Sequence, residues 1–243
     1  GLFTDAERIY GQMLHGNAGS PLPKEGLKRL ASKYLWKSRF SDSAGLYSRL
    51  STLSIYSLDE RLSFFRTAFW LAWGSGDLGS AYQGAIHGLN DLCGKKTAEP
   101  RCEEIAIEVG RLLLEADRNQ EGVTYLKEYL SQKRPNQRRA EAAFIVGKMY
   151  QQIHEDRKAV QYFEESAQSV ARTPGRGGRS RGRESDRERN FAAHAAFVLV
   201  EPYYAKFRAL RLELPESKLK SATREKLAQL ETLATHYSNI VGY

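Results

Sequence analysis

The sequence has little proline, cysteine or methionine and no long hydrophobic run. Its 243 residues include 7 Pro, 2 Cys and 2 Met, and the few cysteines exclude a disulfide-dense scaffold. Apolar residues (41%) and charged residues (27%) occur in ordinary proportions, which excludes collagen and global disorder. The longest strongly apolar run, Phe191 to Val200, is far shorter than the about 20 residues of a membrane-spanning helix. We therefore expect a globular protein with a sizeable core and no transmembrane segment.

Negative charge is also in short supply. Lys and Arg number 37 against 29 Asp and Glu, giving a net charge of +8. Half of this excess lies between Arg172 and Arg189, where seven Arg face three acidic residues. A basic balance favours acidic partners such as nucleic acid, anionic lipid or an acidic peptide.

The rare prolines mark the boundaries between helical segments. Apolar residues recur at spacings of three and four between them, and no convincing pair of alternating strands joined by a tight turn is found. The pattern predicts an all-α protein. Five prolines stand at the boundaries: Pro21, Pro23, Pro100, Pro135 and Pro174.

Small and aromatic residues alternate in the segment from Ala140 to Ala171. A small residue stands where two antiparallel helices would cross, an aromatic residue follows one turn later, and a second small residue lies in the facing helix. This pattern predicts a tightly packed helical hairpin. The residues concerned are Gly147, Tyr150, Ala159 and Phe163.

This hairpin resembles the tetratricopeptide repeat, because those four residues occupy its most characteristic positions. Similar offsets start near Glu103, where Gly110 is the small residue, and also near Phe65 and Glu25. Phe69 stands where a small residue is usual in the second copy. The resemblance covers residues 24 to 171.

The resemblance implies a right-handed α-solenoid of about five helical hairpins. Residues 1–171 would form helical repeats, 172–189 an Arg/Gly-rich loop, and 190–243 a long C-terminal hairpin that continues the solenoid. We expect Pro202 to kink the first helix of that last hairpin. Further repeats or domains are expected in the full-length protein.

A concave face lined by the first helix of each hairpin is the candidate binding site. All three tryptophans fall on the inward positions, among Arg and Lys residues, and such side chains are enriched in binding hot spots. The favoured function is a non-catalytic scaffold that binds a peptide or protein partner in a basic groove, which would suit an acidic partner. The alternative is that the tryptophans pack between neighbouring hairpins. The candidate residues are Arg29, Lys33, Trp36, Lys37, Arg66, Trp70, Trp73, Arg111 and Lys148.

The Arg/Gly-rich segment supports a second hypothesis, the binding of nucleic acid or another polyanion. Dense arginines can contact phosphates, although no aromatic residue is present for base stacking. The alternative is a long solvated loop. The candidate contacts are Arg176, Arg179, Arg181 and Arg183.

Cys93 and Cys102 flank a short segment between two predicted hairpins. They could form a disulfide, which would indicate an oxidising compartment, or they could remain two reduced thiols. The C-terminal region also weakly resembles long repeat proteins of bacterial cell envelopes. Periplasm or cell envelope is therefore favoured over cytoplasm.

Catalytic motifs and metal-ligand patterns are not evident in the sequence. The five histidines are scattered, and neither a phosphate-binding glycine loop nor a nucleophile elbow is found. We therefore expect no enzyme activity, no metal and no cofactor. A third hypothesis is that the chain is the helical, non-catalytic part of a larger cell-wall enzyme.

Overall fold

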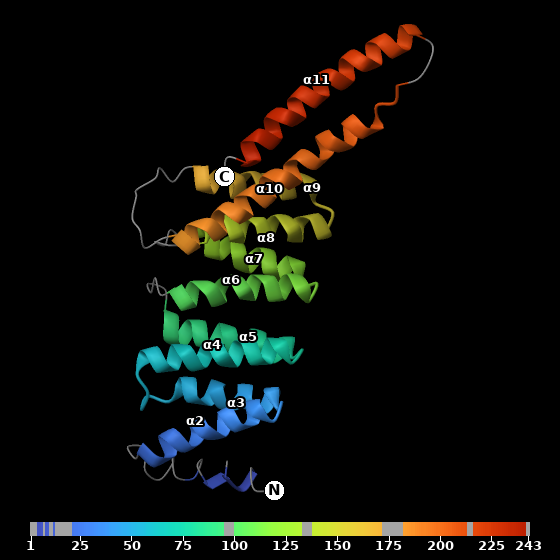
Figure 1. Cartoon of the computed structure of the whole chain (residues 1–243). Helices are drawn as coiled ribbons and strands as arrows, with labels where there is room; N and C mark the ends of the chain where they lie inside the picture. Colours follow the sequence, from blue (N-terminus) through green and yellow to red (C-terminus); the bar gives the residue numbers. More distant parts are fainter. Residues whose placement is uncertain are drawn as a thin grey trace. The chain divides into compact units, whose positions relative to one another are not determined.

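The fold is described from a computed structural model of the chain (Figure 1). The structure describes residues 4–6, 8, 9, 12, 21–94, 100–132, 138–171, 182–212 and 216–241, with side chains omitted at 21–24, 171, 182–185, 216 and 217. Every regular element in these ranges is a helix, and none of the ranges contains a strand. The prediction of an all-α protein is therefore confirmed. No helix within the described ranges has both the length and the hydropathy to cross a membrane.

The chain divides into two compact units, each of which is described by itself. Unit 1 comprises Gly1–Ala116 and Arg134–Asn136, and unit 2 comprises Asp117–Lys133 and Gln137–Tyr243. The helices of unit 1 are α2 (Pro21–Trp36), α3 (Phe40–Thr52), α4 (Leu58–Gly74), α5 (Leu78–Gly88), the π-helical turn η1 (Leu89–Cys93) and α6 (Pro100–Glu115). Those of unit 2 are α7 (Asn119–Ser131), α8 (Arg139–Gln152), α9 (Asp156–Ala171), α10 (Gly182–Ala209) and α11 (Glu216–Val241).

The same tight turn closes the first helix of successive hairpins. Ser38, Gly76, Asp117 and His154 all have positive φ angles, of 55°, 82°, 55° and 59°. In three of these turns the following N–H donates to a carbonyl five residues back, for example from Arg39 to Tyr34 at 2.9 Å. This is the long hydrogen bond of a Schellman motif, which ends a helix and reverses the chain. Within the two units, α2 and α3, α4 and α5, and α8 and α9 therefore run antiparallel.

Unit 1 has a core where α2, α3 and α4 meet. It is formed by apolar and aromatic side chains that are nearly inaccessible, and a capping box fixes the start of α4. In that box, the Ser57 hydroxyl accepts from the Glu60 N–H at 3.3 Å while the Glu60 carboxylate accepts from the Ser57 N–H at 3.1 Å. The core residues are Leu27, Leu30, Ala31, Tyr34, Leu46, Leu50, Tyr56 and Phe64.

A glycine against a phenylalanine ring brings helices together in both units. In unit 2, a Cβ atom added at Gly147 on α8 would lie 2.6 Å from the ring of Phe163 on α9. This is the close approach that the sequence pattern predicts. In unit 1 the phenylalanine lies on the first helix of the hairpin and the glycine on the second. A Cβ atom added at Gly88 on α5 would lie 2.2 Å from the ring of Phe65 on α4. Glycine at position 88 thus leaves room for the large ring of Phe65 on α4.

The long C-terminal hairpin differs from the expected boundaries. Helix α10 begins at Gly182, so residues 182–189 are helical although the sequence interpretation assigned 172–189 to a loop. Contacts with α8, described below, explain why this charged stretch is ordered as helix. Pro202 lies inside α10, which continues to Ala209.

Candidate functional site

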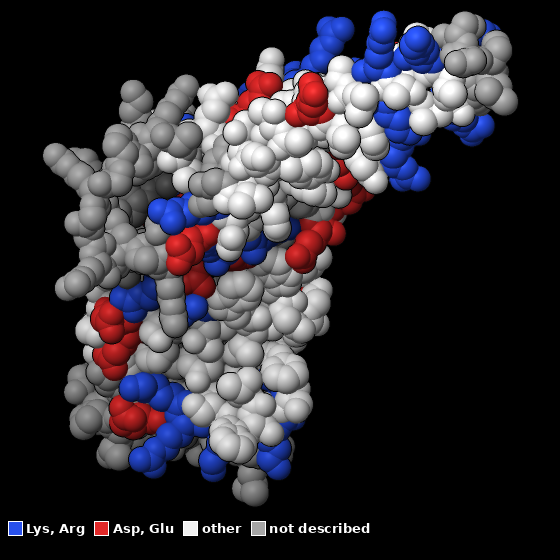
Figure 2. Space-filling model, turned by 45° about the horizontal axis from the view of Figure 1, so that its top comes forward, with Lys and Arg blue, Asp and Glu red and all other residues white. Residues whose placement is uncertain are grey.

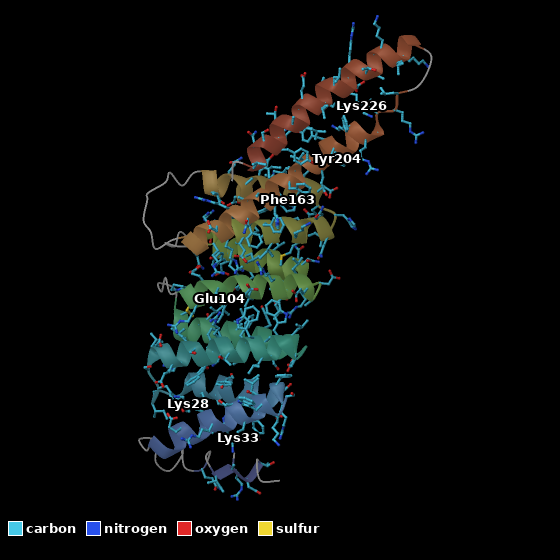
Figure 3. All side chains as sticks on the ribbon, viewed as in Figure 1. Lys28, Lys33, Glu104, Phe163, Tyr204 and Lys226 are labelled. Carbon is cyan, nitrogen blue, oxygen red and sulfur yellow. A yellow bond between two sulfur atoms is a disulfide. The ribbon has the colours of Figure 1, made fainter. Side chains whose placement is uncertain are left out.

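Polar side chains connect the first helices of the hairpins in unit 1. Lys28 on α2 lies 3.4 Å from the Glu60 carboxylate on α4, and Arg66 on α4 donates to Glu104 on α6 at 2.9 Å. Helices α2, α4 and α6 therefore present a continuous face, which we call the first-helix face. Figure 3 labels Lys28, Lys33 and Glu104 on it.

Ion pairs dominate the part of this face near the start of α4 and α6. Arg101 of α6 donates to the Asp59 carboxylate at 2.6 Å and also to the Asp59 carbonyl at 3.2 Å. Lys28 also lies 5.9 Å from the centre of the Tyr56 ring. Burial, with smaller contributions from Glu25 and Glu60, raises the pKa of Tyr56 to about 12. This part of the face is thus a set of satisfied polar contacts.

Aromatic rings dominate the other part of the face, near the end of α4. The rings of Trp70 and Trp73 are stacked, with centroids 5.3 Å apart and an interplanar angle of 9°. Phe69 meets both rings edge-on, at 5.3 Å and 5.4 Å. The Trp73 indole N–H donates to the Glu115 carboxylate of α6 at 3.0 Å. The orientation of Trp73 is therefore fixed by a hydrogen bond to α6. Trp70 remains 39% exposed.

Trp36, the last residue of α2, is 88% exposed. It follows Lys28 by eight residues, and Trp70 follows Glu60 by ten. With a rise of about 1.5 Å per residue, these offsets from the Lys28–Glu60 contact place Trp36 and Trp70 at similar levels on α2 and α4. The tryptophans of unit 1 thus lie toward the same end of the first-helix face.

The cations of this face fall into two groups. Arg29 and Lys33 on α2 and Lys37 in the turn after it are exposed, and Arg29 and Lys33 form no ion pair within the part of the chain that the structure describes. On α4 and α6, Arg66 pairs with Glu104 and Arg111 lies 3.4 Å from Glu108. The predicted basic groove is thus basic along α2 and of mixed charge along α4 and α6.

Lys148 belongs to a different unit from the other candidates. On α8 in unit 2, its ammonium group lies 3.2 Å from the Gln151 side-chain oxygen and 5.9 Å from the centre of the Phe144 ring. These local contacts account for its position.

The arginine candidates for polyanion binding are mostly outside the described residues. Arg176, Arg179 and Arg181 fall there, and Arg183 is described only as part of the α10 backbone. Polyanion binding through this segment therefore stays a prediction.

Cys93 and Cys102 form a disulfide that joins η1 to α6. Both residues are almost completely buried. No group of three His, Cys, Asp or Glu side chains suited to a metal is found among the described residues.

Two features of the site went unrecognised at the level of sequence. The carboxylates of Glu104 and Glu115 stand on predicted inward positions, but their pairing with Arg66 and Trp73 depends on the relative register of α4 and α6. The edge-on packing of Phe69 against both tryptophans was also not predicted. The aromatic cluster on one turn of α4 was the signal available for it.

Comparison with known proteins supports the class of fold. No protein-family model matches the sequence, and no curated protein matches it. Among solved structures, the chain is similar to the crystal structure of BtubC (BKLC) from P. vanneervenii, with a TM-score of 0.52 and 12% sequence identity. The match covers 99% of this chain and 91% of that one. At this identity the likeness concerns the helical fold alone.

Proposed function

We propose that this chain is a non-catalytic scaffold of tetratricopeptide type, a right-handed solenoid of helical hairpins that binds an extended peptide of a partner protein. The proposed binding site is the first-helix face of unit 1. The repeated left-handed turns at Ser38, Gly76, Asp117 and His154 support the repeat assignment. Burial of Gly110, Gly147 and Ala159 at the predicted packing positions also supports it.

The observation that carries the proposal is the stacked pair formed by the exposed Trp70 and the half-buried Trp73. A pair of stacked indoles offers a broad apolar surface whose conformational entropy is already low, because Phe69 and Glu115 hold it. Tryptophan is among the residues most enriched in binding hot spots. An apolar or aromatic side chain of the peptide would pack on Trp70, the more exposed of the two residues.

Charge along α2 defines the second feature of the peptide. Arg29 and Lys33 point to a partner with carboxylates, which would lie along α2 rather than over Arg66 and Arg111. The preferred peptide therefore combines an aromatic or large aliphatic anchor with acidic residues to one side.

The disulfide supports an oxidising compartment such as the periplasm, because such bonds persist mainly outside the cytosol. Peptide selection on the folded protein should accordingly be carried out without reductant.

The test is a selection of peptides from a random library on the chain, followed by titration of the best peptides. We expect Trp70→Ala to weaken their binding at least about tenfold, corresponding to about 1.4 kcal/mol. Phe40→Ala is the matched control, since Phe40 on α3 is 41% exposed, close to the 39% of Trp70. Melting curves of both variants would show that each remains folded.

Two results would contradict the proposal. One is a set of peptides whose affinity is equally unaffected by Trp70→Ala and Phe40→Ala. The other is a tryptophan fluorescence spectrum that does not change on saturation with a bound peptide.

A further inference from the structure

Helix α11 in unit 2 carries two apolar stripes, and only one of them packs on α10. The packed stripe recurs at alternating spacings of three and four, and its side chains are buried or half-buried. Its members are Leu219, Ala222, Lys226, Gln229, Leu233, His236 and Ile240. The second stripe has the same spacing and is largely exposed. Its members are Leu227, Leu230, Ala234, Tyr237 and Val241.

The exposed stripe is the more apolar of the two. Lys226, Gln229 and His236 face α10, and the buried Gln229 Oε1 has no hydrogen-bond partner among the described residues. Leu227, Leu230 and Val241 meanwhile remain 55%, 49% and 86% exposed. An apolar heptad stripe facing water is typical of a helix that packs against another helix. Packing within the hairpin does not account for this stripe.

Helix α10 extends the exposed stripe into a wider surface. The ring of Phe197 on α10 lies 6.2 Å from that of Tyr237 on α11. Tyr204 comes two turns after Phe197, and Leu230 comes two turns before Tyr237 on the antiparallel helix, so this pair lies at a common level. Tyr203 lies elsewhere, since its ring packs on His236 at 4.9 Å.

We call the resulting surface the apolar seam. Phe197 and Tyr204 on α10 are 48% and 46% exposed, and Figure 3 labels Tyr204. Exposed apolar surface that is contiguous in this way is uncommon unless another molecule binds there. The seam comprises Phe197, Tyr204, Leu227, Leu230 and Tyr237.

The charge beside the seam points to the kind of partner. Between Lys206 and Lys226 the sequence has seven Lys and Arg but three Glu, a net charge of +4. Figure 2 shows these Lys and Arg side chains gathered at the tip of the hairpin, at the upper right. Arg208 follows Tyr204 by one helical turn in the direction of that tip. Its guanidinium lies 5.9 Å from the Tyr204 ring. Arg224 lies one turn before Leu227 on the facing helix.

The cations in the first turns of α11 do not stabilise that helix. Lys218 and Lys220 lie near its N-terminus, where the helix dipole favours negative charge. A negatively charged partner would relieve this unfavourable arrangement.

We infer that the apolar seam binds an amphipathic helix of a partner protein, with acidic residues at the end of that helix that meets Arg208 and Arg224. The partner's apolar stripe packs along Leu227, Leu230 and Tyr204, because heptad stripes of two helices interlock at this spacing. A second copy of this chain paired in parallel is disfavoured as the occupant, since it would bring two basic tips together. The inference does not depend on the tryptophan site, which lies in unit 1.

The test uses two synthetic peptides with identical heptad leucines. One carries Glu at the flanking positions of its first two turns, and the other carries Lys at those positions. We expect the chain to bind the Glu peptide at least about tenfold more tightly than the Lys peptide in fluorescence anisotropy. The difference should shrink as salt is added.

Variants locate the binding surface. Leu230→Asp should weaken binding of the Glu peptide at least about tenfold, while the matched control Leu58→Asp should not change it. Leu58 in unit 1 is 53% exposed, against 49% for Leu230. Arg208→Gln with Arg224→Gln should reduce the preference for the Glu peptide and leave the apolar seam intact.

Three outcomes would overturn the inference. The first is equal affinity for the Glu and Lys peptides, and the second is binding that Leu230→Asp leaves unchanged. The third is a concentration-dependent dimer in sedimentation that Leu230→Asp dissociates, which would assign the seam to a second copy. Trp70→Ala serves as a further control, because its effect would indicate that the peptide occupies the first-helix face instead.

Discussion

Neighbouring first helices are joined by an arginine and a glutamate in both units, but the two pairs have very different surroundings. In unit 1, Arg66 and Glu104 lie 2.9 Å apart with side chains 48% and 19% exposed. In unit 2, Arg187 of α10 and Glu141 of α8 lie 2.7 Å apart with side chains 37% and 0% exposed. The ion pair is therefore accessible to water in unit 1, whereas the carboxylate of the pair in unit 2 is inaccessible.

More polar groups surround the pair in unit 2. The Ala140 N–H at the start of α8 donates to the Glu188 carboxylate at 2.8 Å, and Ser166 of α9 donates to the Ala140 carbonyl at 2.7 Å. Arg138 lies 3.9 Å from Glu141. Helix α8 has no side-chain cap from its own N-cap residue, so Glu188 of α10 supplies that contact. The carboxylate of the junction in unit 2 is therefore fully buried, whereas the ion pair in unit 1 remains exposed.

The largest effect that tests this contrast is expected for Arg187→Ala. Removing the guanidinium leaves the fully buried carboxylate of Glu141 without its closest partner, which should lower the free energy of unfolding by about 3 to 5 kcal/mol. Urea denaturation of the variant would measure the loss. Arg189→Ala, at an exposed position on the same helix, is the control and should change stability little. A loss below about 1 kcal/mol for Arg187→Ala would show that the two junctions are equivalent.

A smaller effect is expected from pH, through Glu188. Burial, with a smaller contribution from Glu141, raises the pKa of Glu188 from 4.5 to about 7. The Ala140 N–H and Arg138 oppose this shift. The folded protein therefore retains a proton that the unfolded chain releases. The resulting contribution to stability is complete below pH 4.5 and is lost as the pH rises to about 7.

Glu188→Gln isolates this contribution, because glutamine stays neutral at every pH. Over that interval the wild-type protein should lose up to about 1.4 kcal/mol per pH unit relative to the variant. Denaturant titrations at several pH values would give the two curves. Parallel curves would exclude the raised pKa.

The smallest effect is expected for Arg66→Ala. Its pair with Glu104 is exposed, and such pairs contribute less than about 1 kcal/mol to stability. Thermal or urea unfolding would measure the change. A loss as large as that for Arg187→Ala would remove the distinction between the exposed ion pair of unit 1 and the buried one of unit 2.

Sequence reasoning succeeded where local spacing determines packing. Gly147 and Phe163 were expected at a helix crossing, and Phe163 indeed occupies the space that a side chain at Gly147 would need. Trp70 and Trp73 were expected on one helix face, and their rings are stacked. A spacing of three or four residues is sufficient for both inferences, because helix geometry sets which residues share a face.

The same reasoning failed where the contact joins different helices. Arg66 was assigned to the candidate binding groove without its ion pair with Glu104 on α6 being predicted. Residues 182–189 were assigned to a loop because of their charge, yet Arg187 and Glu188 bind α8 from within a helix. From the sequence alone, charged residues are predicted to face solvent, because their buried partners are not known.

The sequence by itself determined the helical class, the hairpin turns and the faces on which the tryptophans and the small residues lie, because these follow from backbone geometry over a few residues. Only the tertiary structure decided which charges are neutralised, which carboxylates are buried and which apolar stripe of α11 faces water. Those properties depend on the register and distance between helices, and small shifts in either change the partner of a long side chain and its access to solvent.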